Sequence, residues 1–204
     1  MELNPFYETI IDDLISKKFA VVDHFFTNDE VQALKENLVH KYEDDAFKKA
    51  AIGNVFQEQI VKSIRGDYIY WLNEQEDALV ERVFFDKIND LVQYLNRTCF
   101  LGIREKEFHY AVYPEGTFYK RHLDTFQNDD RRKLSIVCYL NDEHWQPDFG
   151  GALAIYHPSE QGEATTLVYP LQGRMVIFES QVLEHEVLPV YKSRFSITGW
   201  LKTS

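Results

Sequence analysis

Cysteine is nearly absent from this sequence. Only Cys99 and Cys138 occur among 204 residues, and they form no CxxC pair. Two scattered thiols are too few for a disulfide framework or for a thiolate zinc site. We therefore expect both thiols to be reduced and to lie in the core, as in a cytoplasmic protein.

Positive charge is also scarce, because 22 Lys and Arg stand against 33 Asp and Glu, a net charge of −11. Binding to nucleic acid depends on basic side chains that replace counterions, so we expect no nucleic-acid partner. The same imbalance disfavours an anionic membrane surface. No apolar run approaches the ~20 residues of a spanning helix. We expect no membrane association, and the sequence leaves the oligomeric state open.

The apolar share of 45%, with 15% aromatic residues, is sufficient for the core of one domain over residues 1–204. Residues 1 to about 102 are predicted to be helical support with leading strands. Helices are predicted after Asn4-Pro5, after the Thr27 and Glu30 capping box, and over 84–100, with a strand over 19–26.

From about 103 to 204 the pattern changes to short β-rich runs separated by turn residues. The runs are FHYAVYP, KLSIVCYLN, GGALAIY, TTLVYP, RMVIF, HEVLPV and RFSITGWL. Short strands at such regular spacing are typical of a β-sandwich or barrel. The predicted class is therefore mainly β with helical support (α+β).

Three side chains suggest a metal site in this β region. His122 and Asp124 are two residues apart, so on a strand they share one face, and His185 begins a later β run. Two imidazoles and one carboxylate can bind one face of an octahedral metal, leave three positions open, and suit Fe(II). Taken alone the pattern is weak, since structural or surface histidines would also explain it.

Arg194 follows His185 in the apolar run RFSITGW. A buried guanidinium is stabilised by pairing in two-pronged fashion with a carboxylate. No acidic residue lies in that run, so an external carboxylate is one candidate partner, and a core Asp or Glu is the alternative.

The segments SIRGDYIYW, YPEGTFYKRHLD, IVCYLN, GGALAIY and HEVLPVYKSRFSITGW extend the pattern over about residues 60–202. Together they resemble the 2-oxoglutarate- and Fe(II)-dependent dioxygenases, and most of all the prolyl 4-hydroxylase type of the oxygen-sensing animal enzymes and their bacterial relatives. The resemblance implies a double-stranded β-helix (jelly-roll) core with helices packed on one sheet. It places the metal site in the β-helix core, about 103–204.

The resemblance also implies residue roles. His122, Asp124 and His185 would hold Fe(II), while Arg194 and Tyr139 would bind the distal carboxylate of 2-oxoglutarate. Further residues implied around the cosubstrate are Tyr113, Tyr119, Thr198 and Trp200, with Leu153 and Val187 as apolar walls. Strict strand alternation, by contrast, would put Tyr119 on the face opposite His122. O2 is the oxidant, and ascorbate is expected to help turnover.

For the second substrate the resemblance implies Arg132, Asp67 and Trp71, with Arg132 exposed and residues 73–82 forming a mobile loop over a peptide. The implied reaction hydroxylates an unactivated C–H, foremost C4 of a prolyl residue in a protein, and forms succinate and CO2. Two alternatives stay open at this point: hydroxylation of a free amino acid or small metabolite, and a non-catalytic cupin-like barrel that binds a metal or ligand.

Overall fold

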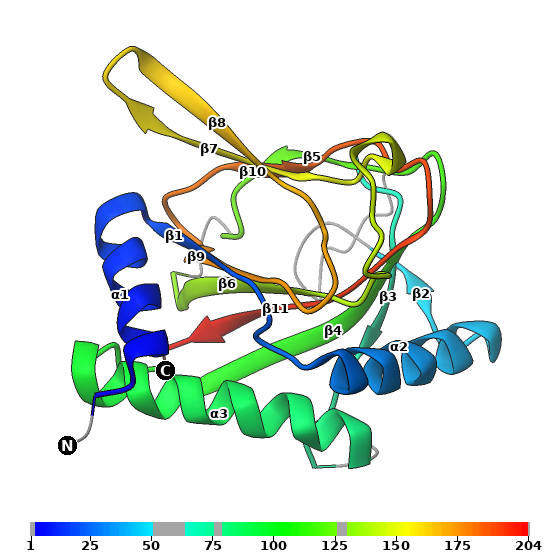
Figure 1. Ribbon diagram of the computed structural model, residues 1–204, viewed down its shortest axis with the longest axis horizontal. Helices are drawn as coiled ribbons and strands as arrows, with labels where there is room; N and C mark the ends of the chain where they lie inside the picture. Colours follow the sequence, from blue (N-terminus) through cyan, green and yellow to red (C-terminus); the bar gives the residue numbers. More distant parts are fainter. Residues whose placement is uncertain (1–2, 51–63, 76–78, 126–129, 204) are drawn as a thin grey trace.

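Two antiparallel β-sheets face each other in the computed structural model, which describes residues 3–50, 64–75, 79–125 and 130–203 (Figure 1). The major sheet has seven strands in the order β1-β9-β6-β11-β4-β3-β2, and the minor sheet has four in the order β5-β10-β7-β8. The helices lie on the side of the major sheet that faces away from the minor sheet (Figure 1). The predicted β core with helices on one sheet is thereby confirmed.

The helices of the described ranges are α1 (Pro5–Lys17), α2 (Asn28–Glu43), α3 (Leu79–Cys99) and the short 3-10 helix η1 (Pro147–Phe149). The strands are β1 (Phe19–Val22), β2 (Lys48–Lys49), β3 (Tyr68–Trp71), β4 (Glu105–Tyr113), β5 (Tyr119–His122), β6 (Arg132–Tyr139), β7 (Leu153–Ser159), β8 (Gly162–Val168), β9 (Met175–Glu179), β10 (His185–Val187) and β11 (Arg194–Lys202).

The first two helices begin where the capping chemistry predicts. The Asn4 side chain accepts a hydrogen bond from the Phe6 amide at the start of α1. Thr27 and Glu30 each bind the other's backbone amide at the start of α2, which satisfies two amides that have no partner within the helix. The third helix begins at Leu79, earlier than the predicted residue 84.

The major sheet is buried on both faces, because alternate side chains enter two different cores. Residues packed with the helices include Phe108, Tyr110, Val112, Ile136, Cys138, Met175, Ile177, Ile197 and Leu201. Residues packed toward the minor sheet include Ala111, Tyr113, Val137, Tyr139, Val176 and Phe178, together with Leu153, Ile155, Val168 and Val187 of the minor sheet. This double burial explains why the β runs read as continuous apolar segments. We call the side of the major sheet that faces the minor sheet its inner face, and the side packed with the helices its outer face.

The sequence prediction differs from the structure at several strands. The predicted strand over 19–26 stops at Val22, because a turn follows in which His24 has a φ of 57°. Strands β2 and β5 were not among the predicted runs. Strands β1, β2 and β3 of the first part are members of the major sheet, so the two predicted parts share one sheet.

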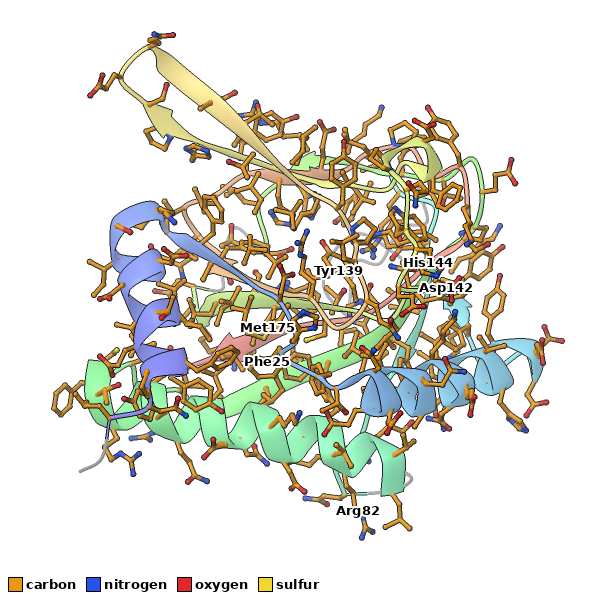
Figure 2. The ribbon with its side chains drawn as sticks, viewed as in Figure 1. Phe25, Arg82, Tyr139, Asp142, His144 and Met175 are labelled. Carbon is orange, nitrogen blue, oxygen red and sulfur yellow. The ribbon has the colours of Figure 1, made fainter. Side chains whose placement is uncertain are left out.

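The predicted lid over 73–82 is wrong for the residues that the structure describes. Leu79 to Arg82 form the first turn of α3, and Asn73 to Gln75 form a tight turn, while 76–78 lie outside the described residues. Figure 2 shows Arg82 beyond α3, with the helix and the major sheet between it and Tyr139. The physical reason is that α3 must bury its apolar stripe on the outer face of the sheet, which carries this segment away from the inner face.

None of the helices in the described ranges combines the length and the apolar character needed to cross a membrane.

Candidate metal and cosubstrate site

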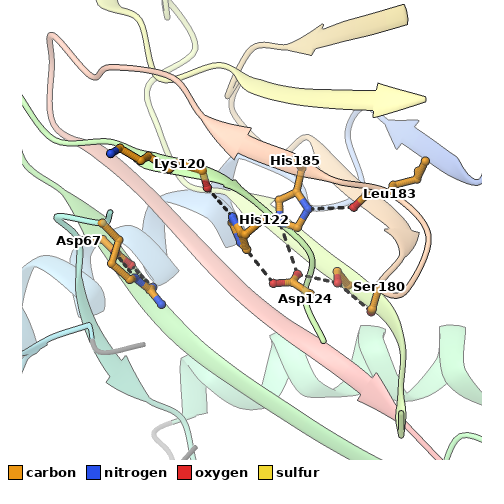
Figure 3. Close-up of polar contacts among 9 residues, drawn as sticks. Asp67, Lys120, His122, Asp124, Ser180, Leu183 and His185 are labelled. Atoms are coloured by element: carbon orange, nitrogen blue, oxygen red, sulfur yellow. Dashed lines mark hydrogen bonds and ion pairs between the residues drawn. The ribbon is translucent and has the colours of Figure 1, made fainter. Parts of the chain in front are cut away.

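His122, Asp124 and His185 meet on the inner face between the two sheets (Figure 3). One ligand atom from each lies within 4.8 Å of the others. The Nε2 atom of His122 is 3.5 Å from Asp124 Oδ1, and Nε2 of His185 is 3.5 Å from Asp124 Oδ2. Strands β5 and β10 bring the imidazoles together, because His122 is the cross-strand partner of His185. Strand β5 ends at His122, so Asp124 reaches the site from the following turn and not from the predicted strand face.

Backbone carbonyls select the tautomer of both imidazoles. Nδ1 of His122 lies 2.7 Å from the Lys120 carbonyl oxygen, and Nδ1 of His185 lies 3.2 Å from that of Leu183. A carbonyl can only accept, so each Nδ1 carries a proton, and Nε2, which faces Asp124, is the nitrogen left to bind a metal. Burial lowers the pKa of His185 to about 4, which keeps this imidazole neutral at neutral pH. Neutral imidazole is the form that binds a metal.

Two buried hydroxyls support the carboxylate of Asp124. Ser135 donates to Asp124 Oδ2 over 2.7 Å, and the Ser135 and Ser180 hydroxyls are 2.8 Å apart (Figure 3). Burial alone would raise the pKa of Asp124, but the imidazoles of His185 and His122 and the Ser135 hydroxyl together hold it well below its usual range. The site therefore presents a carboxylate and two imidazoles, a donor set that suits Fe(II).

Arg194 lies on the inner face, as the cross-strand partner of Tyr113, with 1% exposure and, within the described part of the chain, no carboxylate in salt-bridge distance. Its Nε donates to the Gly151 carbonyl over 3.1 Å, and its guanidinium carbon lies 5.0 Å from the Tyr113 ring and 4.9 Å from the Tyr139 ring. Among the described residues, the buried Tyr139 hydroxyl finds no hydrogen-bond partner of good geometry. A buried cation and such a hydroxyl side by side fit an external carboxylate. Within the same ranges, no core Asp or Glu pairs with Arg194, which was the alternative.

The chain around Gly151 is built for close approach to Arg194. Gly150 and Gly151 both have positive φ values, 68° and 66°. A Cβ atom at Gly150 would lie 2.2 Å from the Pro189 carbonyl oxygen, and one at Gly151 would lie 3.1 Å from the Arg194 side chain. The next strand carries Leu153, which pairs with Val187, and both are buried beside Tyr113 and Tyr139. These two residues lie where apolar walls were expected.

Tyr119 shares a side with His122, although strict alternation predicts opposite faces. His185 pairs with His122 and Val187 pairs with Tyr119, so between these two pairs one residue of β10, Glu186, lies opposite two residues of β5. This is a β-bulge, and its extra residue reverses the direction of every side chain beyond it. The Tyr119 and His122 rings are stacked, with centroids 3.7 Å apart and an interplanar angle of 19°. Burial raises the pKa of Tyr119 to about 12.

Beyond the triad, the inner face of β11 continues through Thr198 to Trp200. Trp200 has its ring centroid 5.6 Å from that of His109 and 6.3 Å from that of Trp71, which is 52% exposed. The guanidinium of Arg132 lies 3.5 Å over the Trp200 ring and pairs with Glu107. Arg132 is therefore buried, which corrects the expected exposed arginine. An extra residue in β6 opposite Leu201 and Lys202 turns Arg132 inward.

Asp67 is also buried, at 1% exposure, where a position near a substrate was implied. Its two carboxylate oxygens accept from Arg65 Nε at 2.8 Å and from Arg65 Nη2 at 2.6 Å. The carboxylate is thus engaged inside the protein.

Sequence reasoning missed Ser135, Ser180, Arg65 and His109. Ser135 and His109 carried a usable signal, since each is a polar residue inside an apolar β run and such residues must find partners when buried. His109 is buried, its Nδ1 makes no hydrogen bond of good geometry, and burial lowers its pKa to about 3. Arg65 and Ser180 lie in segments without a comparable signal.

Comparison with known proteins gives a consistent set of relatives. Residues 108–202 match the family model of the 2OG-Fe(II) oxygenase superfamily. The chain is 29% identical over 203 residues to the Caenorhabditis elegans protein named hypoxia-inducible factor prolyl hydroxylase, covering 95% of this chain and 28% of that protein. The chain thus spans well under half the length of that curated relative.

Two solved structures share the fold closely. The crystal structure of a Pseudomonas putida prolyl-4-hydroxylase is 34% identical, with a TM-score of 0.86, and the match covers 97% of this chain and 99% of that one. A Trichoplax adhaerens prolyl hydroxylase, solved in complex with a peptide fragment of the hypoxia inducible factor oxygen degradation domain, is 25% identical with a TM-score of 0.86, covering 96% of this chain and 88% of that one.

Proposed function

The chain belongs to the 2-oxoglutarate- and Fe(II)-dependent oxygenase superfamily, and from that membership we propose that it is a prolyl 4-hydroxylase acting on a protein. One observation carries the proposal most directly. Two imidazoles and a carboxylate come together on the inner face, which also carries a buried arginine that has no carboxylate partner among the described residues. This is the arrangement needed to hold a metal and a dicarboxylic acid next to each other.

Each part of the site has a task in this reaction. His122, Asp124 and His185 would hold Fe(II), with Ser135 orienting the carboxylate. Arg194 and Tyr139 would bind the distal carboxylate of 2-oxoglutarate. Leu153 and Val187 exclude water at its flank. When bound, Fe(II) and 2-oxoglutarate supply the O2-dependent hydroxylation of an unactivated C–H, with succinate and CO2 as the other products.

The substrate side is proposed to be the aromatic group of Trp71, Trp200 and His109, together with Arg132. Trp71 and Trp200 offer flat apolar surface on the inner face, which suits the ring of a prolyl residue. The C. elegans and T. adhaerens relatives are named as prolyl hydroxylases, which supports a peptide over a free metabolite. Thr198 lies two residues before Trp200 on β11 and so shares its face of the strand.

We further propose that residues 1–204 act as one domain, since strands from both parts of the chain share the major sheet. The two free cysteines, one buried and one half-buried, support a cytoplasmic site of action.

The test is turnover with Fe(II), 2-oxoglutarate, ascorbate and a library of proline-containing peptides under air. Succinate formation coupled to a +16 Da mark on a proline is the expected result, and Asp124→Ala and His185→Ala should both abolish it. Succinate formation driven by a free amino acid, with no mark on any peptide, would overturn the protein substrate. A wild-type chain that binds neither Fe(II) nor 2-oxoglutarate would overturn the enzyme.

A further inference from the structure

Four side chains form a continuous column that ends on the metal ligand His122. Asp67 is paired with Arg65 through two hydrogen bonds of 2.8 Å and 2.6 Å. The Arg65 guanidinium carbon lies 4.3 Å from the centroid of the Tyr119 ring. That ring stacks on His122 at 3.7 Å. Two groups this close cannot share one ring face, so Arg65 and His122 lie on opposite faces of Tyr119.

Backbone hydrogen bonds join the segment that carries Arg65 to the segment that carries Tyr119. The Gly66 amide donates to the Phe118 carbonyl over 3.1 Å, and the Lys120 amide donates to the Ile64 carbonyl over 2.9 Å. Arg65 and Tyr119 are paired across this short ladder. A Cβ atom at Gly66 would lie 2.9 Å from the Thr117 side chain, so glycine permits this close approach. The backbone segments that carry Arg65 and Tyr119 are therefore held at a fixed distance from each other.

The His122 side chain is less enclosed by the protein than the His185 side chain. The His185 side chain is 6% exposed and packs against Phe178, with ring centroids 4.6 Å apart. The His122 side chain is 18% exposed. The hydrogen bond from Nδ1 of His122 to the Lys120 carbonyl holds the imidazole at one atom. The stacked Tyr119 ring restrains the orientation of the imidazole plane.

We propose that Tyr119, Arg65 and Asp67 are positioning residues that hold the His122 imidazole with Nε2 directed at the metal position. The inference rests on the proposed function, because it takes His122 as a metal ligand. It also changes two roles implied by the resemblance. Tyr119 acts through its ring face on His122 and not directly on the cosubstrate, and Asp67 acts inside the protein and not on the second substrate.

The experiment is a titration of each purified variant with Mn(II), followed by the electron paramagnetic resonance signal of free Mn(II). Tyr119→Leu removes the ring and should weaken Mn(II) binding on the order of tenfold, the usual size of losses in groups that orient a metal ligand. Tyr119→Phe keeps the ring and should bind Mn(II) as the wild type does. Arg65→Gln combined with Asp67→Asn removes both charges at once, so no unpaired buried charge remains. This double variant should show a smaller loss in the same direction.

The matched control is Arg121→Gln on the same strand. The Arg121 guanidinium lies 3.9 Å over the Tyr156 ring and pairs with Glu163, which repeats the arginine–tyrosine–carboxylate contact toward the β7–β8 hairpin. It should leave Mn(II) affinity unchanged. A second readout is the visible charge-transfer band of the anaerobic Fe(II) and 2-oxoglutarate complex, which should shift in Tyr119→Leu and stay in place in Tyr119→Phe.

The outcomes separate the two proposals. Wild-type protein that binds no Mn(II) contradicts the proposed function. Wild-type protein that binds Mn(II), with Tyr119→Phe as weak as Tyr119→Leu, shows that the hydroxyl acts and overturns the column. If Tyr119→Leu does not fold, the double variant decides, and unchanged affinity and band position there overturn the column as well.

Discussion

Replacing Arg194 by methionine should remove the response to 2-oxoglutarate while leaving the unliganded fold about as stable as before. Arg194 is 1% exposed, and no carboxylate of the described residues is paired with it. A buried ion without such a partner costs several kcal/mol, which methionine would relieve. Against this stands the lost hydrogen bond to the Gly151 carbonyl, about 1–3 kcal/mol when the acceptor stays unsatisfied. The two effects have opposite signs and similar sizes.

In the proposed site 2-oxoglutarate supplies the carboxylate partner of Arg194, so Arg194→Met should weaken 2-oxoglutarate binding by the full value of that pair. Truncating one partner of a buried charged pair costs about 2–5 kcal/mol, a ~30- to ~4,000-fold loss of affinity. At a 2-oxoglutarate concentration of about 100 times the wild-type Kd, the wild type gains about 2.7 kcal/mol, or about 5–11 °C in Tm for a domain of this size. At the same concentration Arg194→Met should gain less than about 1 kcal/mol.

The assay is thermal unfolding with Mn(II) in place of Fe(II), with and without 2-oxoglutarate. Arg194→Lys should recover part of the shift, because an ammonium lacks the planar fork of the guanidinium. Arg174→Met is the control, since that guanidinium already has its own carboxylate in Asp23, 2.6 Å away, and its removal should leave the shift intact. An Arg194→Met protein that is strongly destabilised yet keeps the full 2-oxoglutarate shift would refute the assignment.

Three further predictions follow from the described contacts. Ser135→Ala should weaken Mn(II) binding on the order of tenfold, because Asp124 loses the hydroxyl that orients it, and unchanged affinity would contradict that role. Burial lowers the pKa of His109 to about 3. As the pH falls below about 6.5, this imidazole takes up a proton in the unfolded chain but not in the folded one, so the free energy of unfolding declines. His109→Phe should flatten that decline by up to about 1.4 kcal/mol per pH unit in urea unfolding, and exposed His144→Gln should not. Trp71→Ala should reduce peptide hydroxylation while sparing peptide-free consumption of 2-oxoglutarate, and equal losses would place Trp71 on the cosubstrate side.

Much of the fold and of the site could be read from local patterns. The capping residues Asn4 and Thr27 predicted two helix starts, because capping depends on neighbours within a few residues. The apolar β runs predicted the core strands. His122, Asp124, His185 and Arg194 were identified by residue type and by family resemblance; the structure brings the first three together and buries Arg194 on the inner face. Capping and alternation depend on short spacings along the chain, which is why the sequence shows them.

The tertiary structure alone decided where side chains point once regular alternation breaks. The bulge in β5 turns Tyr119 onto His122, and the irregularity in β6 turns Arg132 inward, although neither leaves a mark in the sequence. The family resemblance implied a mobile loop over 73–82, but the need of α3 to bury its apolar stripe placed Leu79 to Arg82 in that helix, on the side of the major sheet away from the inner face. Partners such as Ser180 for Ser135, and Arg65 for Tyr119, come from distant segments. Register between strands is set by long-range packing, and a shift of one residue reverses every side chain, which is why local sequence could not determine these contacts.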